Sequence, residues 1–134
     1  MMRNISQAFF LAGAVFALCG MVWGIQMSAT GDHLLSPAHG HLNLIGFVAM
    51  SVFGAWYALT PAAARSGLAK AHFALSVVSV VVLVPGIAMA ITGRGEALAK
   101  GGSVLAVLAL AMFAWVVLRY GRDTGRAVAG QPAE

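Results

Sequence analysis

Charged residues and cysteine are both scarce in this sequence. Only 9% of its 134 residues are Asp, Glu, Lys or Arg, whereas 60% are hydrophobic. Because so little polar material cannot cover a water-soluble globule, the composition excludes a soluble domain. The single cysteine also excludes an internal disulfide framework and a zinc or iron–sulfur site built from the cysteines of one chain. The sequence therefore predicts an integral membrane protein.

Four long apolar runs account for most of the chain. A membrane-spanning helix needs about 20 mainly apolar residues, and the windows that satisfy this requirement are Gln7–Met27, His39–Leu59, His72–Ile91 and Ser103–Tyr120. The segments between these runs are short and contain the glycine and proline expected of turns. We predict an all-α fold in which residues 1–134 form a single domain, a four-helix transmembrane bundle.

The basic residues predict how this bundle is oriented. Lysine and arginine concentrate on the cytoplasmic flanks of spanning helices. Two basic residues lie on one side of the predicted membrane, Arg94 and Lys100, and the other six lie on the opposite side: Arg3, Arg65, Lys70, Arg119, Arg122 and Arg126. We therefore expect both termini in the cytoplasm, with the chain embedded in the lipid of a bacterial-type inner membrane. Because topology explains these cations, the net charge of +4 predicts no nucleic-acid partner.

Polar residues gather where the second run begins. His39, His41 and Asn43 open this run, and His33 lies in the loop before it. Such groups are costly inside a membrane and mark candidate functional sites. Side chains two positions apart on an α-helix point about 200° apart, so His39 and His41 would face different neighbours. If the segment is not helical, His33, His39 and His41 could instead chelate copper or zinc.

A fourth histidine, His72, opens the third run at the opposite face of the membrane. A span of about 20 residues, each rising about 1.5 Å, separates the two faces by about 30 Å. His72 is therefore too distant to share a site with the other histidines. We expect it to be a polar residue at the membrane interface.

Small residues recur every three or four positions in the first two runs. Stripes of this kind allow helices to approach closely in lipid, although a flat macrocycle needs the same clearance. The two stripes are Gly13, Ala17, Gly20 and Gly24 in the first run, and Gly46, Met50 and Gly54 in the second. We expect close packing of these two helices.

The segment from His39 to Gly54, together with Tyr57, resembles the haem-ligating helix of the haem-copper oxidase superfamily, which comprises the cytochrome oxidases and nitric oxide reductases. In that superfamily a His-x-His helix begins at the outer face and carries a glycine a few residues later. A subsequent outer loop supplies arginine to the haem propionates, the position that Arg94 would take here. The family's catalytic subunit has three pseudo-equivalent groups of four helices, and this four-helix chain is similar to one such group.

The resemblance implies a cofactor and an oligomer. Haem b would lie between neighbouring second helices, with His41 of one protomer and His39 of the next as its axial ligands. Asn43 would hydrogen-bond an imidazole or a propionate, Gly46 would leave room for the porphyrin, and Arg94 would pair with a propionate. The pseudo-threefold arrangement of the family suggests a homotrimer. The implied activity is electron transfer with a redox partner, or redox or gas sensing.

The departures from the family pattern limit what this chain can do. The family's copper centre needs further histidines, with a tyrosine four residues after one of them, but the position four residues after His39 is Asn43. We therefore do not expect independent oxygen reductase activity. Two other interpretations remain open: a copper- or zinc-binding membrane protein, and a cofactor-free accessory subunit of a respiratory complex.

Overall fold

The computed structural model describes residues 4–130, with the backbone alone for residues 123–128. Every element in this described range is a helix: α1 (Ile5–Thr30), α2 (Ser36–His41), the π-helix η1 (Leu42–Val48), α3 (Ala49–Leu59), α4 (Pro61–Ala64), α5 (Gly67–Ile91) and α6 (Ala97–Ala129). Four segments are long and apolar enough to cross a membrane: Ile5–Thr30, Ser36–Leu59, Gly67–Ile91 and Ala97–Arg122. The predicted all-α fold with four spanning helices is confirmed.

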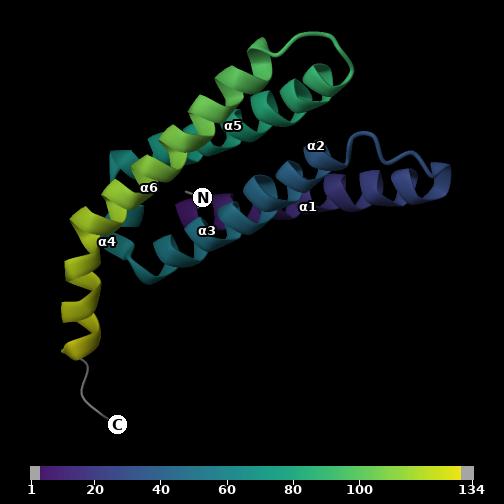
Figure 1. Cartoon of the computed structure of the whole chain (residues 1–134). Helices are drawn as coiled ribbons and strands as arrows, with labels where there is room; N and C mark the ends of the chain where they lie inside the picture. Colours follow the sequence, from purple (N-terminus) through teal and green to yellow (C-terminus); the bar gives the residue numbers. More distant parts are fainter. Residues whose placement is uncertain (1–3, 131–134) are drawn as a thin grey trace.

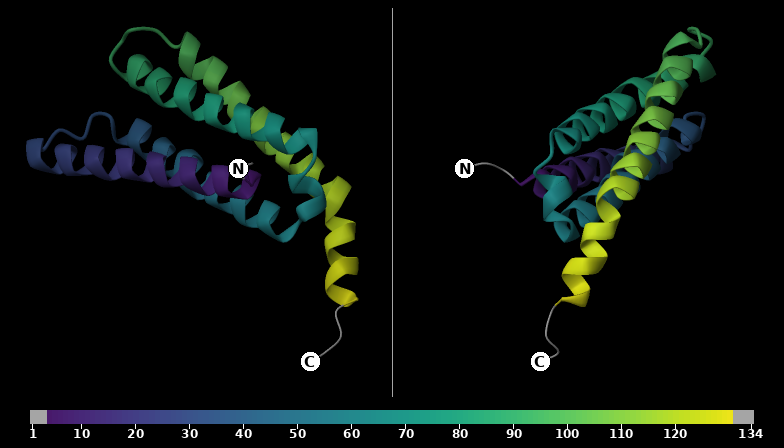
Figure 2. Two further views of the ribbon diagram at one scale, coloured as in Figure 1. Left: turned by 180° about the vertical axis from the view of Figure 1, so that it is seen from behind. Right: turned by 90° about the vertical axis from the view of Figure 1, so that its left-hand side faces the viewer.

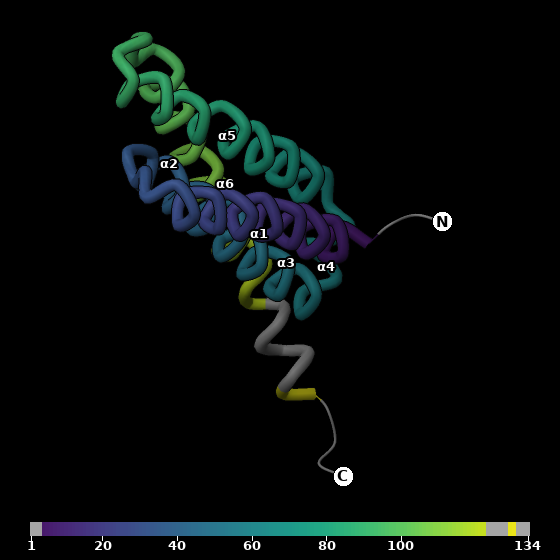
Figure 3. Tube along the Cα trace, turned by 90° about the vertical axis from the view of Figure 1, so that its right-hand side faces the viewer, coloured from purple at the N-terminus to yellow at the C-terminus, as the bar shows by residue number. Residues whose placement is uncertain are grey.

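The four spans form two antiparallel hairpins. The first pairs α1 with the continuous stretch α2, η1 and α3, the second pairs α5 with α6, and the short α4 joins them (Figure 1). Both hairpin loops lie at one end of the bundle, here named the loop end, and the hairpins diverge toward it (Figure 2). The beginning of α1 and the short α4 lie at the opposite end, here named the terminal end (Figure 3), and α6 extends past α4 (Figure 1).

Local signals in the sequence set where the helices begin and end. Asn4 caps α1 by accepting a hydrogen bond from the backbone N–H of Ser6 at 3.2 Å, and Ser66 caps α5 by accepting one from Ala69 at 3.3 Å. At the other end of α1, Gly31 adopts a left-handed conformation with φ 69°, which glycine tolerates best. The side-chain caps at Asn4 and Ser66 each supply a hydrogen-bond acceptor to a first-turn N–H that has none within its own helix.

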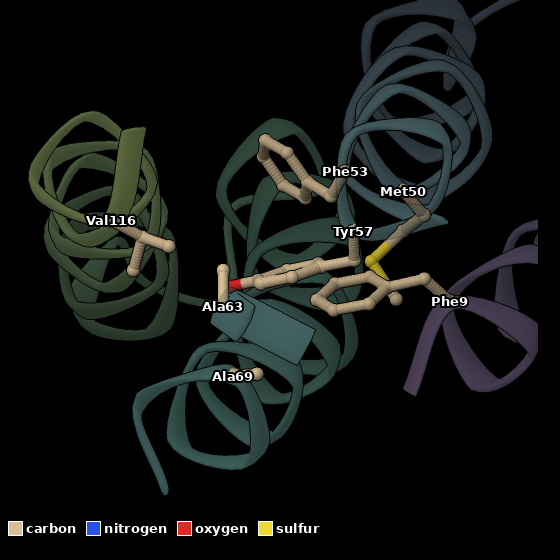
Figure 4. Packing of buried hydrophobic residues seen from close by; sticks show 7 residues of the cluster. All are labelled: Phe9, Met50, Phe53, Tyr57, Ala63, Ala69 and Val116. Atoms are coloured by element: carbon tan, nitrogen blue, oxygen red, sulfur yellow. The ribbon is translucent and has the colours of Figure 1, made fainter. Parts of the chain in front are cut away.

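Aromatic side chains form the main core, near the terminal end. Phe9 of α1 stacks on Tyr57 of α3 with ring centroids 5.4 Å apart, and the edge of Phe53 approaches Phe9 at 5.8 Å. Figure 4 shows this cluster reaching α6, where Val116 is fully buried. Much of the remaining apolar surface faces outward: Leu118, for example, is 73% exposed. An outer surface of this kind suits lipid rather than water.

Two glycines allow α5 and α6 to pack closely. A Cβ atom on Gly102 of α6 would lie 2.5 Å from the Cα of Leu83, and one on Gly86 of α5 would lie 2.6 Å from the backbone nitrogen of Ala99. Both obstacles are backbone atoms, so a side chain at either position would push α5 and α6 apart. Close packing of the first two spans was predicted from their small residues, but this closer approach of α5 to α6 was not.

The second span is not a uniform α-helix. The π-helical stretch η1 follows His41 directly, and the backbone N–H of Ala49 bonds the carbonyl of Leu44, five residues earlier. Within this stretch, the side-chain amide of Asn43 donates to the carbonyl of His39 at 3.1 Å. π-Helical turns inside longer helices occur frequently at functional sites. The π-helical turn therefore marks the segment that follows His39 and His41 as a candidate functional site.

Candidate functional site

The histidine pair lies on the short helix α2, immediately after the first loop. Pro37 sits in the first turn of α2, where its missing N–H costs nothing. The ring of His41 is exposed, and its Nδ1 donates a hydrogen bond to the Pro37 carbonyl at 2.7 Å. A carbonyl oxygen can only accept, so this contact places the proton on Nδ1 and leaves the lone pair on Nε2. His41 thus presents a metal-binding nitrogen on an oriented ring.

His39 points in another direction, toward α1. Its half-buried ring donates a hydrogen bond from Nε2 to the carbonyl of Gly20 at 2.9 Å and meets the edge of Trp23 at 5.9 Å. A Cβ atom on Gly24 would lie 3.2 Å from the same Nε2. His39 and His41 therefore face different surroundings, as their spacing predicts. The hydrogen bond to Gly20 occupies Nε2 of His39, one of the two ring nitrogens that could bind iron in a second protomer.

The glycines of the first two spans face larger side chains of the opposite helix, which they allow to approach closely. Gly20 faces the side chain of Asn43, and a Cβ on Gly13 would touch Met50 at 3.4 Å. Gly46, expected to leave room for a porphyrin, is buried instead against Phe16 of the same chain, whose Cβ lies 3.0 Å from where a Cβ of Gly46 would be. Within this chain the clearance at Gly46 accommodates Phe16, and its expected role beside a porphyrin stays a prediction.

The other predicted site residues lie in the loops. His33 is exposed between α1 and α2, and Arg94 is exposed between α5 and α6. Within residues 4–130, and wherever side chains are described, no three histidine, cysteine or acidic side chains come together as a metal-binding group. The copper or zinc chelate of His33, His39 and His41 is thus not assembled in this conformation.

His72 is buried in the protein, so its side chain does not extend to the membrane interface as the sequence predicted. Its side chain is 0% exposed, and its ring centroid lies 4.6 Å from that of Phe53 and 5.2 Å from that of Phe9. Nδ1 is hydrogen-bonded to the hydroxyl of Tyr57 at 3.1 Å. The aromatic core covers His72 because α5 begins five residues before it and has already entered the bundle at that point.

Among the side chains that the structure describes, two buried polar atoms close to this core make no hydrogen bond: Nε2 of His72 and Oγ of Ser76, one helical turn further along α5. Ser76 lines a cavity of about 250 Å³ between the second, third and fourth spans, together with Ser79 and Ala109. No pattern in the sequence connects Tyr57, His72 and Ser76. Only the register between α3 and α5 brings them together.

Comparisons with family models, with curated proteins and with solved structures give no match to this chain. The resemblance of its second span to a haem-ligating helix rests on the residues of that span alone.

Proposed function

We propose that this chain is a membrane haem b-binding protein that acts in electron transfer or in redox or gas sensing, with His41 as an iron ligand. The observation that supports this proposal is the 2.7 Å hydrogen bond from Nδ1 of the exposed His41 to the Pro37 carbonyl. Histidines that bind metals through one nitrogen commonly donate the other N–H to a carbonyl, which fixes the tautomer and the ring orientation. Each histidine contacts a carbonyl through one ring nitrogen, but the ring of His41 is exposed, whereas that of His39 is half-buried against α1.

The proposal changes the ligand set suggested by the sequence. Because His39 bonds Gly20 through Nε2, we assign it a positioning role in which it ties α2 to α1. Asn43 supports the same turn by donating to the His39 carbonyl. The second axial ligand would come from a neighbouring copy, whose own His41 is the available group. The homo-oligomer expected from the sequence is kept in this proposal, but a ligand pair made of the same residue in two copies suits a dimer, so the expected trimer does not follow from it.

Arg94 at the loop end fits a cofactor with acidic side groups. Haem b, when bound, supplies an iron that exchanges one electron and can accept a gas ligand. Arg94 would provide a cation for a propionate at the membrane surface, where charge-assisted hydrogen bonds are strong. In this proposal the loop end faces the periplasm of a bacterial inner membrane, because Arg65, Lys70, Arg119 and Arg122 all belong to the terminal end.

An absorption spectrum with a pyridine haemochrome assay tests this function. We expect the purified full-length protein to show a Soret band that sharpens on reduction. The matched control is His33→Ala, which removes an exposed histidine from the adjacent loop and should leave the spectrum unchanged. Colourless protein that contains stoichiometric copper or zinc would reject the haem proposal and support the copper- or zinc-binding alternative. Colourless, metal-free protein would favour the accessory-subunit alternative.

A further inference from the structure

A cavity of about 470 Å³ opens at the terminal end of the bundle, at the opposite end from His39 and His41. It lies where the beginning of α1, the end of α3, the short α4 and the first turn of α5 meet. The fully buried Tyr57 contributes to its inner wall. The eight lining residues are Asn4, Ile5, Tyr57, Ala58, Pro61, Ala64, Arg65 and Lys70.

The charged side chains around this cavity carry one sign. Arg65 and Lys70 both line it, and none of the eight lining residues is acidic. The two acidic residues whose side chains are described, Asp32 and Glu96, lie in the hairpin loops at the opposite end of the bundle. Glu96 is already paired there with Lys100 at 2.9 Å. The lining cations of the cavity thus face no described carboxylate that could neutralise them.

The helix directions add to this positive field. α1 and α5 both begin at the cavity, and the peptide dipoles of each helix place partial positive charge at its first turn. Neither first turn contains an acidic residue. Lys70 lies in the first turn of α5, where a cation is repelled by the helix dipole. An anion in the cavity would relieve this repulsion.

The position of the cavity identifies the class of anion. α1 and α5 start spans long enough to cross the membrane, so the cavity lies at the level of the lipid headgroups. Its remaining wall includes apolar side chains such as Ile5 and Ala58, which suit an acyl chain. Basic pockets between membrane helices bind the phosphate groups of anionic lipids. We propose that this cavity binds the headgroup of an anionic phospholipid, with Arg65 and Lys70 contacting its phosphate.

Equilibrium binding of lipid to the delipidated full-length protein in neutral detergent tests this proposal. The probes are phosphatidylglycerol, phosphatidylcholine and inorganic phosphate. We expect phosphatidylglycerol to bind more tightly than phosphatidylcholine, and the double variant Arg65→Gln with Lys70→Gln to weaken its binding by about 30-fold. The matched control, Arg94→Gln with Lys100→Gln, removes the same charge from the loop end and should leave the affinity unchanged.

Three results would overturn the site. Equal affinity for both lipids would show that the headgroup charge is not recognised. An unchanged affinity in the Arg65 and Lys70 double variant, or an equal loss in the control, would show that the cavity does not hold the phosphate. Inorganic phosphate that binds as tightly as phosphatidylglycerol would identify a free anion, and not a lipid, as the occupant. Circular dichroism of each variant verifies that the helices are retained.

Discussion

Replacing Gly102 by alanine should disrupt the packing of α5 on α6. The new Cβ would lie 2.5 Å from the Cα of Leu83, whereas ordinary contact begins at 3.4 Å, so the helices must separate by about 0.9 Å. Overpacking of this kind costs about 1–3 kcal/mol, and a backbone obstacle places the cost near the upper limit because backbone cannot rotate aside. Gly102→Ala should therefore lower the free energy of unfolding by about 2–3 kcal/mol.

The preceding residue provides the control. Gly101 is exposed, and a Cβ there would meet nothing within 4 Å. Because alanine favours helix over glycine, Gly101→Ala should raise the free energy of unfolding by up to about 1 kcal/mol. Helical circular dichroism during denaturation in mixed micelles measures both variants. If the two variants differ by less than about 0.5 kcal/mol, a margin within which distant surface changes usually fall, the close approach of α5 to α6 is refuted.

Two further predictions concern the buried polar groups of the core, measured by the same denaturation assay. Tyr57→Phe should lower the free energy of unfolding by about 1–3 kcal/mol, because it leaves Nδ1 of His72 buried without a partner; an unaffected protein would contradict this role of the hydroxyl. Ser76→Ala should leave the free energy of unfolding unchanged or raise it, because the Ser76 hydroxyl is buried without a partner. Ser79→Ala should lower it by about 0.5–1.5 kcal/mol, because the Ser79 hydroxyl donates to the Ser76 carbonyl at 2.7 Å. The reverse order would disprove this interpretation of the pair.

The spans could be predicted from the sequence because hydropathy depends on composition over many residues. Each predicted run lies inside an observed span. Every observed span begins earlier than predicted, whereas the second and third end as predicted, at Leu59 and Ile91. The first span begins at Ile5 where Gln7 was expected, and the third begins at Gly67 where His72 was expected. Caps set where these helices begin. Asn4 and Ser66 each accept one hydrogen bond from the first turn of their helix, and a hydropathy average does not detect such a bond.

The surroundings of individual polar residues could not be predicted in the same way. The extension of α5 to Gly67 moves His72 from the expected interface into an aromatic core. Likewise, the spacing of His39 and His41 predicts that they diverge, but it does not say which of them faces α1. Their directions depend on the position of Gly20 on a different helix and on the π-helical turn that follows His41. These directions depend on tertiary contacts between helices, which no local sequence pattern predicts.

The most direct test of the proposed haem site compares two variants of the same turn by haem content per chain. His41→Ala removes the exposed imidazole, and His39→Gln keeps a side-chain N–H that can still donate to Gly20. If His41 binds the iron and His39 only positions α2, the first variant should lose the pyridine haemochrome signal and the second should retain it. Full haem content in His41→Ala, or its loss in His39→Gln alone, would contradict this assignment.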